Sequence, residues 1–418
     1  MQIQMPSGSV DDLAGLVDRL RRDRRTDPYR GRQEYSHAAR DLTDRCEALI
    51  DAGEAVTVVP VLRKAADRMT TALMYMDDSS GIVGDDLQRI MDLYARACVA
   101  APPNPKRLAS WLVKVECDGP GWPRILLRDF APALGASGLV EVEHLVAERA
   151  ETADPESWSG QFAIRGLREQ LAEVSGDVDR YVQVLAEHLA SAVQYARIVD
   201  ALCSAGRLVE AAAWARRGLA EKVGWPHTDE LRNTLVGLLL EEGQIEEALE
   251  MRRADFERNP TLASYRAWVS TSAQAGVADP TSAAVERLRR RATEQPAYMT
   301  ELVDILVATG AHDEAWTVGK ADPNRLGRQR WLTLLAQRSS VDPADVIEPY
   351  QDLVEVQVRD SGDKHRYRRA LPLISALQAV CRAAGQDDRF AAYLIDFRER
   401  HRRRPTLIKT LDGAGFGA

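Results

Sequence analysis

The sequence predicts an all-α protein, a tetratricopeptide-like α-solenoid in which antiparallel helix pairs stack on one another. Three observations predict this fold. Apolar residues recur at intervals of three and four along most of the chain, glycines recur with a period near 34 residues, and strand signals are nearly absent. We therefore expect more than about 60% helix and close to no strand.

The helical periodicity is clearest in the middle of the chain. In 208–219 the apolar positions are Leu208, Ala212, Ala215 and Leu219, and 231–239 repeats the pattern at Leu231, Leu235, Leu238 and Leu239. Such spacing places the apolar side chains on one face of a helix and leaves charged residues on the other. The β-rich run 56–59 is followed by Pro60, after which helical spacing resumes.

A repeat of helix, glycine, short polar turn and second helix is the strongest internal signal. The turn glycines are Gly206, Gly243, Gly276 and Gly310, separated by 37, 33 and 34 residues, with weaker echoes at Gly53, Gly176 and Gly385. Ala211, Ala248 and Ala315 each follow a turn glycine by five residues, whereas the Gly276 unit lacks this alanine. Glycine can end the first helix in the left-handed conformation, and alanine lets the second helix pack closely. The period is that of tetratricopeptide-like repeats.

Dense proline and glycine mark three interruptions, at 100–106, 117–123 and 152–157. They divide the chain into an N-terminal helical region at about 10–150 and a repeat array at about 155–400, with a basic cap helix that continues to about 410. One helix pair cannot bury its own apolar face, so neighbouring pairs must stack, and stacking produces a groove.

The composition excludes several classes of protein. With 63 acids against 55 bases the net charge is −8, which does not suit a protein that coats nucleic acid. Five scattered cysteines, none in a CxC or CxxC pair, indicate buried thiols in a reducing compartment. The N-terminus lacks a signal peptide pattern, and no apolar run approaches the roughly 20 residues that span a bilayer. We therefore expect a cytoplasmic protein without membrane contact.

Several segments together resemble the helical region that follows the zinc module in bacterial SWIM zinc-finger proteins. These segments are MDDSSG at 76–81, LGASGL at 134–139, GDVDRYVQVLAEHL at 176–189, the repeats at 201–260, and YLIDFRERHRRRPTLIKTLDGAGF at 393–416. The resemblance covers roughly 10–416 and rests on order and spacing. It implies a helical interaction platform that works within a complex.

The chain departs from that family at the zinc module, which needs CxC followed by CxH. No such spacing occurs here, and the scattered cysteines do not supply four ligands for tetrahedral zinc. We therefore carry over no metal ligand and expect no structural zinc and no cofactor.

Catalytic motifs are likewise absent from the sequence: there is no HxxxH or HExxH, no GxSxG and no phosphate-binding loop. Four acids lie in the loop 77–86, where two interpretations compete. They could hold a hard cation such as Mg²⁺ or Ca²⁺. Alternatively they supply turn chemistry and an N-cap for a helix that begins near Asp86, which is the interpretation we favour.

Two kinds of residue are candidates for partner binding. Trp122 and Trp225 each precede a proline in a turn, so we expect both to be partly exposed, and interface hot spots are enriched in tryptophan. A basic segment near the C-terminus contains Arg398, Arg400, Arg402, Arg403, Arg404 and Lys409. It is either the polar outer face of a terminal repeat or a contact for phosphate or an acidic protein.

The sequence thus predicts a non-enzymatic scaffold or adaptor that binds a protein partner in a cytoplasmic complex. The alternative is a nucleic-acid-associated subunit that contacts phosphate through 398–409, and an enzyme with an unrecognised site is a third hypothesis. The identity of the partner, the pathway and the oligomeric state are not predicted.

Overall fold

The computed structural model describes residues 10–21, 31–75, 78–153, 158–221 and 228–417. Within these residues the chain is an all-α fold of stacked helix pairs, and 81% of it is helical, with no strand among the described residues. The predicted tetratricopeptide-like α-solenoid class is confirmed. By its internal contacts the chain divides into two compact units, unit 1 from Met1 to Leu235 and unit 2 from Val236 to Ala418.

Unit 1 begins with α1 and ends within α11. Its helices are α1 (Val10–Arg19), α2 (Gly31–Asp51), α3 (Ala55–Leu73), α4 (Ile82–Ala100), α5 (Pro105–Asp118), α6 (Leu127–Thr152), α7 (Trp158–Val174), α8 (Val178–Ala186), α9 (Ala192–Ser204), α10 (Leu208–Glu221) and the first part of α11 (Thr228–Glu241). The predicted interruptions at 100–106, 117–123 and 152–157 coincide with the ends of α4, α5 and α6.

Unit 2 contains the remaining helices and two short 3-10 turns. They are the rest of α11, then α12 (Ile245–Arg258), α13 (Leu262–Gln274), α14 (Thr281–Glu294), η1 (Pro296–Tyr298), α15 (Met299–Ala308), α16 (His312–Ala321), α17 (Pro323–Leu326), α18 (Arg328–Ser339), η2 (Pro343–Val346), α19 (Ile347–Arg359), α20 (Arg366–Ala383), α21 (Asp387–Arg400) and α22 (Pro405–Gly413).

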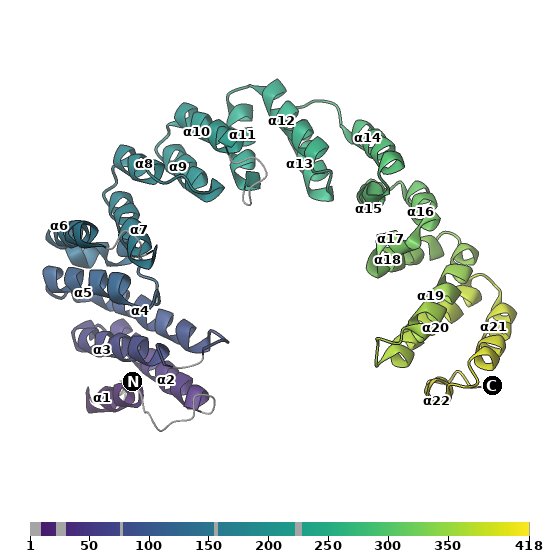
Figure 1. Cartoon of the computed structure of the whole chain (residues 1–418), viewed down its shortest axis with the longest axis horizontal. Coiled ribbons are helices and arrows are strands. Elements are labelled where there is room, and N and C mark those ends of the chain that lie inside the picture. The colour runs from purple at the N-terminus through teal and green to yellow at the C-terminus, as the bar shows by residue number, and fades with distance from the viewer. Residues whose placement is uncertain (1–9, 22–30, 76–77, 154–157, 222–227, 418) are drawn as a thin grey trace, which may run out of the picture. The chain divides into compact units, whose positions relative to one another are not determined.

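The first seven helices form two layers (Figure 1). The helices α2, α4 and α6 contact one another in sequence, while α5 contacts α7 in the second layer; α3 packs on α4, α5 on α6, and α6 on α7. Consecutive helices therefore lie in opposite layers, which is the arrangement expected of stacked helix pairs.

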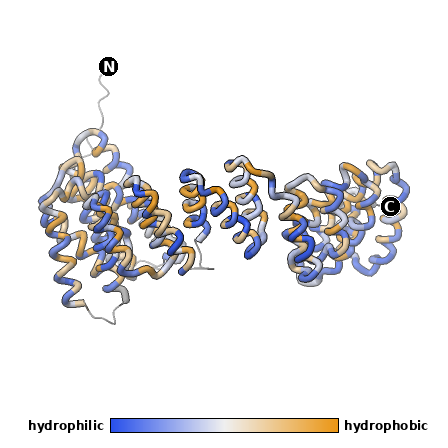
Figure 2. Tube along the Cα trace, turned by 90° about the horizontal axis from the view of Figure 1, so that it is seen from above, coloured by the Kyte–Doolittle hydropathy of each residue, from blue (hydrophilic) through white to orange (hydrophobic). Residues whose placement is uncertain are grey.

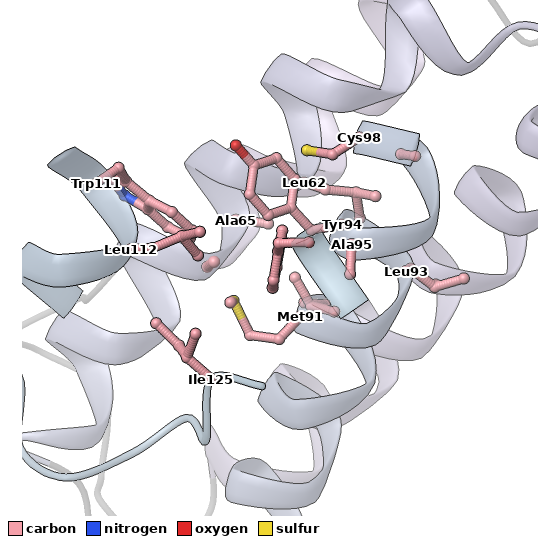
Figure 3. Packing of buried hydrophobic residues seen from close by; sticks show 14 of the residues in the cluster. Leu62, Ala65, Met91, Leu93, Tyr94, Ala95, Cys98, Trp111, Leu112 and Ile125 are labelled. Carbon is pink, nitrogen blue, oxygen red and sulfur yellow. The ribbon is translucent and has the colours of Figure 1, made fainter. Parts of the chain in front are cut away.

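A continuous apolar core runs between these layers and includes Tyr94, Trp111 and Phe130. The ring centroids of Tyr94 and Trp111 are 5.1 Å apart in an edge-to-face arrangement, and those of Tyr94 and Phe130 are 5.8 Å apart. Figure 3 shows Tyr94 and Trp111 among Leu62, Met91 and other core residues. Unit 2 has its own core, which extends from Phe256 to Phe416.

The turn at Gly206 shows how one helix of a pair ends and the next begins. Gly206 has φ +74°, its N–H donates to the carbonyl of Cys203, and the N–H of Arg207 donates to the carbonyl of Leu202. These two bonds form a Schellman motif, which requires a left-handed residue, and glycine adopts that conformation at little cost. The same pair of bonds with a left-handed glycine recurs at Gly53, Gly243, Gly276, Gly310 and Gly385.

The alanines of the repeat lie where helices approach closely. Ala211, Ala248 and Ala315 are all fully buried, as the repeat pattern predicts. In the Gly276 unit, which lacks the alanine at that position, Ala284 is buried on the following helix instead. Orange hydrophobic and blue hydrophilic stretches alternate along many of the helices (Figure 2), as expected of helices with one apolar face.

Two local features differ from a regular helix. Pro60 lies inside α3, which therefore includes the β-rich run 56–59 and lacks one backbone hydrogen bond. Gly135, with φ +55° and ψ −173°, divides α6 into two helical stretches. Among the described residues, no helix has the length and apolar character needed to cross a bilayer.

We expect the Ala211→Leu substitution to lower the free energy of unfolding by roughly 1–3 kcal/mol, because the added methylenes must enter a filled contact between helices. The matched control is Ala213→Leu, which changes an exposed position on the same helix and should alter stability by less than about 0.5 kcal/mol. Thermal and urea unfolding measure both effects. Equal stability of the two variants would contradict the assignment of the repeat.

Candidate functional site

The largest groove that we describe lies in unit 1 and has a volume of about 1120 Å³. It is formed by the end of α5, the loop 119–126, the start of α6, and parts of α7, α8 and α9. We call it the α7 groove, because α7 contributes Phe162, Gly166, Glu169, Gln170 and Glu173 to its lining.

The loop 119–126 forms one wall of the α7 groove and carries Trp122. This tryptophan is half-buried against the core, and its Nε1–H donates to the carbonyl of Gly84 at 2.9 Å. The side-chain amide of Gln88 accepts a hydrogen bond from the N–H of Arg124 at 3.0 Å and donates one to the carbonyl of Arg124 at 3.2 Å. The loop is therefore fixed to α4, and Trp122 presents only part of its ring to the groove.

Three side chains from three helices form a polar network at the opposite wall. Arg197 of α9 donates to the carboxylate of Glu169 of α7 at 2.5 Å and to the hydroxyl of Tyr181 of α8 at 2.9 and 3.2 Å. Burial raises the pKa of Tyr181, and the Arg197 guanidinium opposes this rise. Because the guanidinium is a planar fork, it fixes the relative positions of the three helices.

The α7 groove also contains an exposed aromatic side chain. Phe162 is 52% exposed, although α7 buries Ala163, Ile164, Leu167 and Leu171 on its apolar face. The guanidinium of Arg165 lies 5.4 Å from the centre of the Phe162 ring. A large exposed aromatic residue at the edge of a groove is a typical anchor for a partner.

Carboxylates outnumber cations in the α7 groove. Five acids line it, namely Glu116, Glu169, Glu173, Asp177 and Asp200, against Arg124, Arg128 and Arg197. Arg197 pairs with Glu169, and Arg128 lies 3.8 Å from Glu173. Asp177 caps α8 through the N–H of Arg180.

Two of these carboxyl groups are held in an environment that disfavours their charge. Burial raises the pKa of Glu116, an effect that the N–H of Ile125 and the Arg124 guanidinium oppose. Burial, and then the nearby Glu230 carboxylate, raise the pKa of Asp200. No ion pair involves Asp200 within the described residues. Both carboxylates would therefore gain from a cation supplied by a ligand.

The loop 77–86 serves as a helix cap in the described part. The carboxylate of Asp78 accepts the N–H groups of Val83 and Gly84 at 3.1 and 2.7 Å, and α4 begins at Ile82, four residues earlier than predicted. Asp86 is buried inside the helix, where it accepts from Ser36 and pairs with Arg40. Asp77 lies outside the described residues.

The predicted basic segment belongs to unit 2 and is not one continuous helix. Arg398 and Arg400 lie in the last turn of α21, residues 401–404 form a turn, and α22 begins at Pro405. Pro405 favours this break, because proline disfavours helical geometry at the residue before it.

Four of the six cations in this segment contact groups of unit 2 itself. Arg398 pairs with Asp412 and bonds the carbonyl of Phe416, and Arg404 donates to the carbonyl of Val358 at 2.8 Å. Arg400 contacts Asp396 and Glu355, and Arg402 contacts Glu399. Arg403 and Lys409 are exposed, and the side chain of neither takes part in an ion pair or hydrogen bond within the described ranges.

The other predicted anchor, Trp225, lies outside the described residues. Sequence reasoning missed Phe162, Tyr181 and Arg197. One signal was available for Phe162, since this aromatic residue falls off the apolar stripe of its helix.

Among the described residues, no group of three His, Cys, Asp or Glu could hold a metal ion. Burial raises the pKa of Cys46 to about 12 and that of Cys98 to about 11, so these thiols stay protonated at neutral pH. The described lining of the α7 groove contains no histidine or cysteine.

A family model described as a family of unknown function, DUF6880, matches residues 64–407. The chain belongs to this family. The match includes both walls of the α7 groove and the basic segment up to Leu407, so these features lie in the part of the chain that the DUF6880 family defines. No curated protein matches the sequence.

Comparison of this DUF6880 member with solved structures gives matches of low sequence identity and low TM-score. They include Naa15/Naa10 bound to HypK-THB, with 12% identity and a TM-score of 0.31 over 96% of this chain and 68% of that one. The Cut9–Hcn1 hetero-tetramer of APC/C is 12% identical, with a TM-score of 0.25 over 91% of this chain and 89% of that one. The TPR domain of P58(IPK) is 12% identical, with a TM-score of 0.21 over 85% of this chain and 98% of that one.

We expect Glu116→Gln to raise the melting temperature at neutral pH. The pKa of Glu116 in the folded state is raised above its ordinary value of 4.5. Ionisation of this carboxyl therefore lowers the free energy of unfolding at pH values above 4.5. The gain should disappear as the pH falls below about 4.5, where the carboxyl is protonated in both states.

The matched control is Asp118→Asn, two residues away. Hydrogen bonding by Arg149 lowers the pKa of Asp118, so its carboxylate stabilises the fold above the ordinary value of 3.8, and its removal should lower the melting temperature at pH 7. Melting curves recorded from pH 3 to pH 8 separate the two signs. A neutral-pH loss of stability in both variants would contradict the electrostatic account of Glu116.

Proposed function

We propose that this DUF6880 member is a non-enzymatic adaptor that binds a segment of another protein in the α7 groove. The observation that carries the proposal is the groove itself. It has a volume of about 1120 Å³, and its lining contains the exposed Phe162 and more carboxylates than cations. Helical-repeat stacks characteristically use such grooves to hold extended or helical segments.

The groove favours a segment that carries both an apolar and a basic side chain. Phe162 offers an apolar surface, and burial raises the pKa of both Asp200 and Glu116, so each carboxylate is held where its charge is disfavoured. A lysine or arginine of the segment would supply a cation beside such a carboxylate and so favour its charged form. An apolar residue beside it would cover the Phe162 ring.

The rigid walls support a binding function. Trp122 is hydrogen-bonded to the carbonyl of Gly84, and hydrogen bonds of Arg197 link α7, α8 and α9. The groove is therefore formed before any partner binds. A preformed groove spends little conformational entropy on binding.

That the adaptor works in a cytoplasmic complex remains a prediction. Its resemblance to SWIM zinc-finger proteins remains a prediction as well. The nucleic-acid alternative loses much of its basis, since four of the six cations in 398–409 contact unit 2 itself.

The variant Phe162→Ser/Asp200→Lys should lower the affinity for the partner at least about tenfold, since it removes the apolar anchor and reverses one charge. Val140→Ser is the control, because Val140 is 65% exposed in the same unit and does not line the groove. A photo-crosslinking residue at position 166 identifies the partner in extracts of the native host. Calorimetry with the purified partner then measures the affinities.

The proposal fails if the crosslinked protein binds the groove variant and the wild type equally well. It also fails if the control loses as much affinity as the groove variant. Circular dichroism verifies that both variants keep the helical fold.

A second variant, Arg403→Gln/Lys409→Gln, tests the nucleic-acid alternative without breaking the internal contacts of Arg398, Arg400, Arg402 and Arg404. We expect no change in binding to duplex DNA or RNA at low salt. Electrophoretic mobility shifts measure this. If wild type binds duplex DNA with a log–log salt slope near −2 that the double variant abolishes, two phosphate contacts are established and the alternative stands.

A further inference from the structure

A second groove in unit 1 lies between α3 and α5 and has a volume of about 890 Å³. Its cations are Arg63, Lys106, Arg107 and Lys114, and its carboxylates are Asp67 and Asp118. We propose that this α3–α5 groove binds an acidic segment of a protein, a ligand distinct from that of the α7 groove.

The cations of this groove are available to a ligand. Arg107 and Lys114 are exposed, and neither takes part in an ion pair among the described residues. Arg63 stacks its guanidinium 5.4 Å from the centre of the Trp111 ring and is not ion-paired within the described ranges. Lys106 alone reaches a carboxylate, that of Glu141 at 3.4 Å.

The two carboxylates are already occupied. Asp67 accepts the Nε1–H of Trp111 at 2.8 Å, and Asp118 accepts two hydrogen bonds from Arg149, a cation outside the groove lining. The charge of Asp118 is thus balanced by Arg149, so the lining keeps an excess of positive charge in a chain whose net charge is −8. Local positive charge on an acidic protein attracts an anionic partner.

The spacing of the cations suits a peptide. Arg107 and Lys114 lie seven residues apart on α5, which places them two turns and about 10 Å apart along one face. Glutamates seven residues apart on a helical ligand, or three apart on an extended one, match that distance. The exposed side chain of Met74 and the residues Thr70 and Ser110 also belong to the lining.

Nucleic acid fits this groove less well. Proteins that hold single strands stack bases on exposed aromatic faces. The one aromatic side chain among the described lining residues is Trp111, which is 6% exposed and whose ring lies against Arg63. The groove therefore offers charge without a stacking surface, and an acidic peptide is the better occupant.

The test uses the full chain and fluorescence anisotropy with a labelled oligoglutamate peptide, with an oligoglutamine peptide of equal length as reference. We expect oligoglutamate to bind at least about tenfold more tightly at low salt, and the advantage to shrink as salt rises. Arg107→Glu/Lys114→Glu should remove it. Asp118→Asn should strengthen binding, because it removes a groove carboxylate and releases Arg149.

The matched control is Arg290→Glu/Lys364→Glu, which changes one arginine and one lysine that are exposed in unit 2 and have no ion pair among the described residues. It should keep the full affinity for oligoglutamate. Melting temperatures verify that both double variants fold.

Three results would overturn the proposal. The first is equal binding of oligoglutamate and oligoglutamine to the wild type. The second is an equal loss of affinity in the groove variant and the control, which would show a general effect of net charge. The third is tighter binding of a single-stranded oligonucleotide than of oligoglutamate, lost in Arg107→Glu/Lys114→Glu, which would assign the groove to nucleic acid.

Discussion

In the regular helix pairs, a single residue in the left-handed conformation determines where the first helix ends. At Gly206 and at the equivalent turns, two backbone bonds close the helix end only if the residue after it has positive φ. An L side chain there would meet its own carbonyl at a cost of roughly 1–2 kcal/mol. The chain therefore reverses at a defined residue, and the apolar face of the next helix falls into register with its neighbour.

The grooves occur where the chain departs from that regular pattern. The connection between α5 and α6 has no left-handed glycine followed by a buried alanine five residues later; instead, the longer loop 119–126 is held by side chains of α4. Five residues of this loop, Gly121, Trp122, Arg124, Ile125 and Leu126, line the α7 groove. The regular turns thus supply rigidity, and the irregular connection supplies the concave surface on which a ligand would lie.

Much of the fold could be predicted from the sequence because the determining signals are local. A glycine followed five residues later by an alanine is visible in the chain, and the structure places Gly206, Gly310, Ala211 and Ala315 as expected. The site was less accessible, because its members come from separate helices. Nothing local indicates that Arg197 reaches Glu169 across 28 residues, or that Arg404 donates to Val358 across 46. A run of cations in sequence was therefore not a free basic surface in space.

The end of α5 and the loop after it are shared by both grooves. Asp118, Gly119 and Pro120 line the α3–α5 groove, while Gly121 and Trp122, the next residues, line the α7 groove. The loop is thus a thin partition with a positively charged compartment on one side and a negatively charged one on the other. Hydrogen bonds to Gly84 and Gln88 of α4 hold this partition, so a ligand that shifted it from one side would work against them and would change the space on the other side. By thermodynamic linkage, whatever one ligand does to the affinity of the second, the second does to the first. Two partners of opposite charge would then sense each other through a few residues of backbone, without touching.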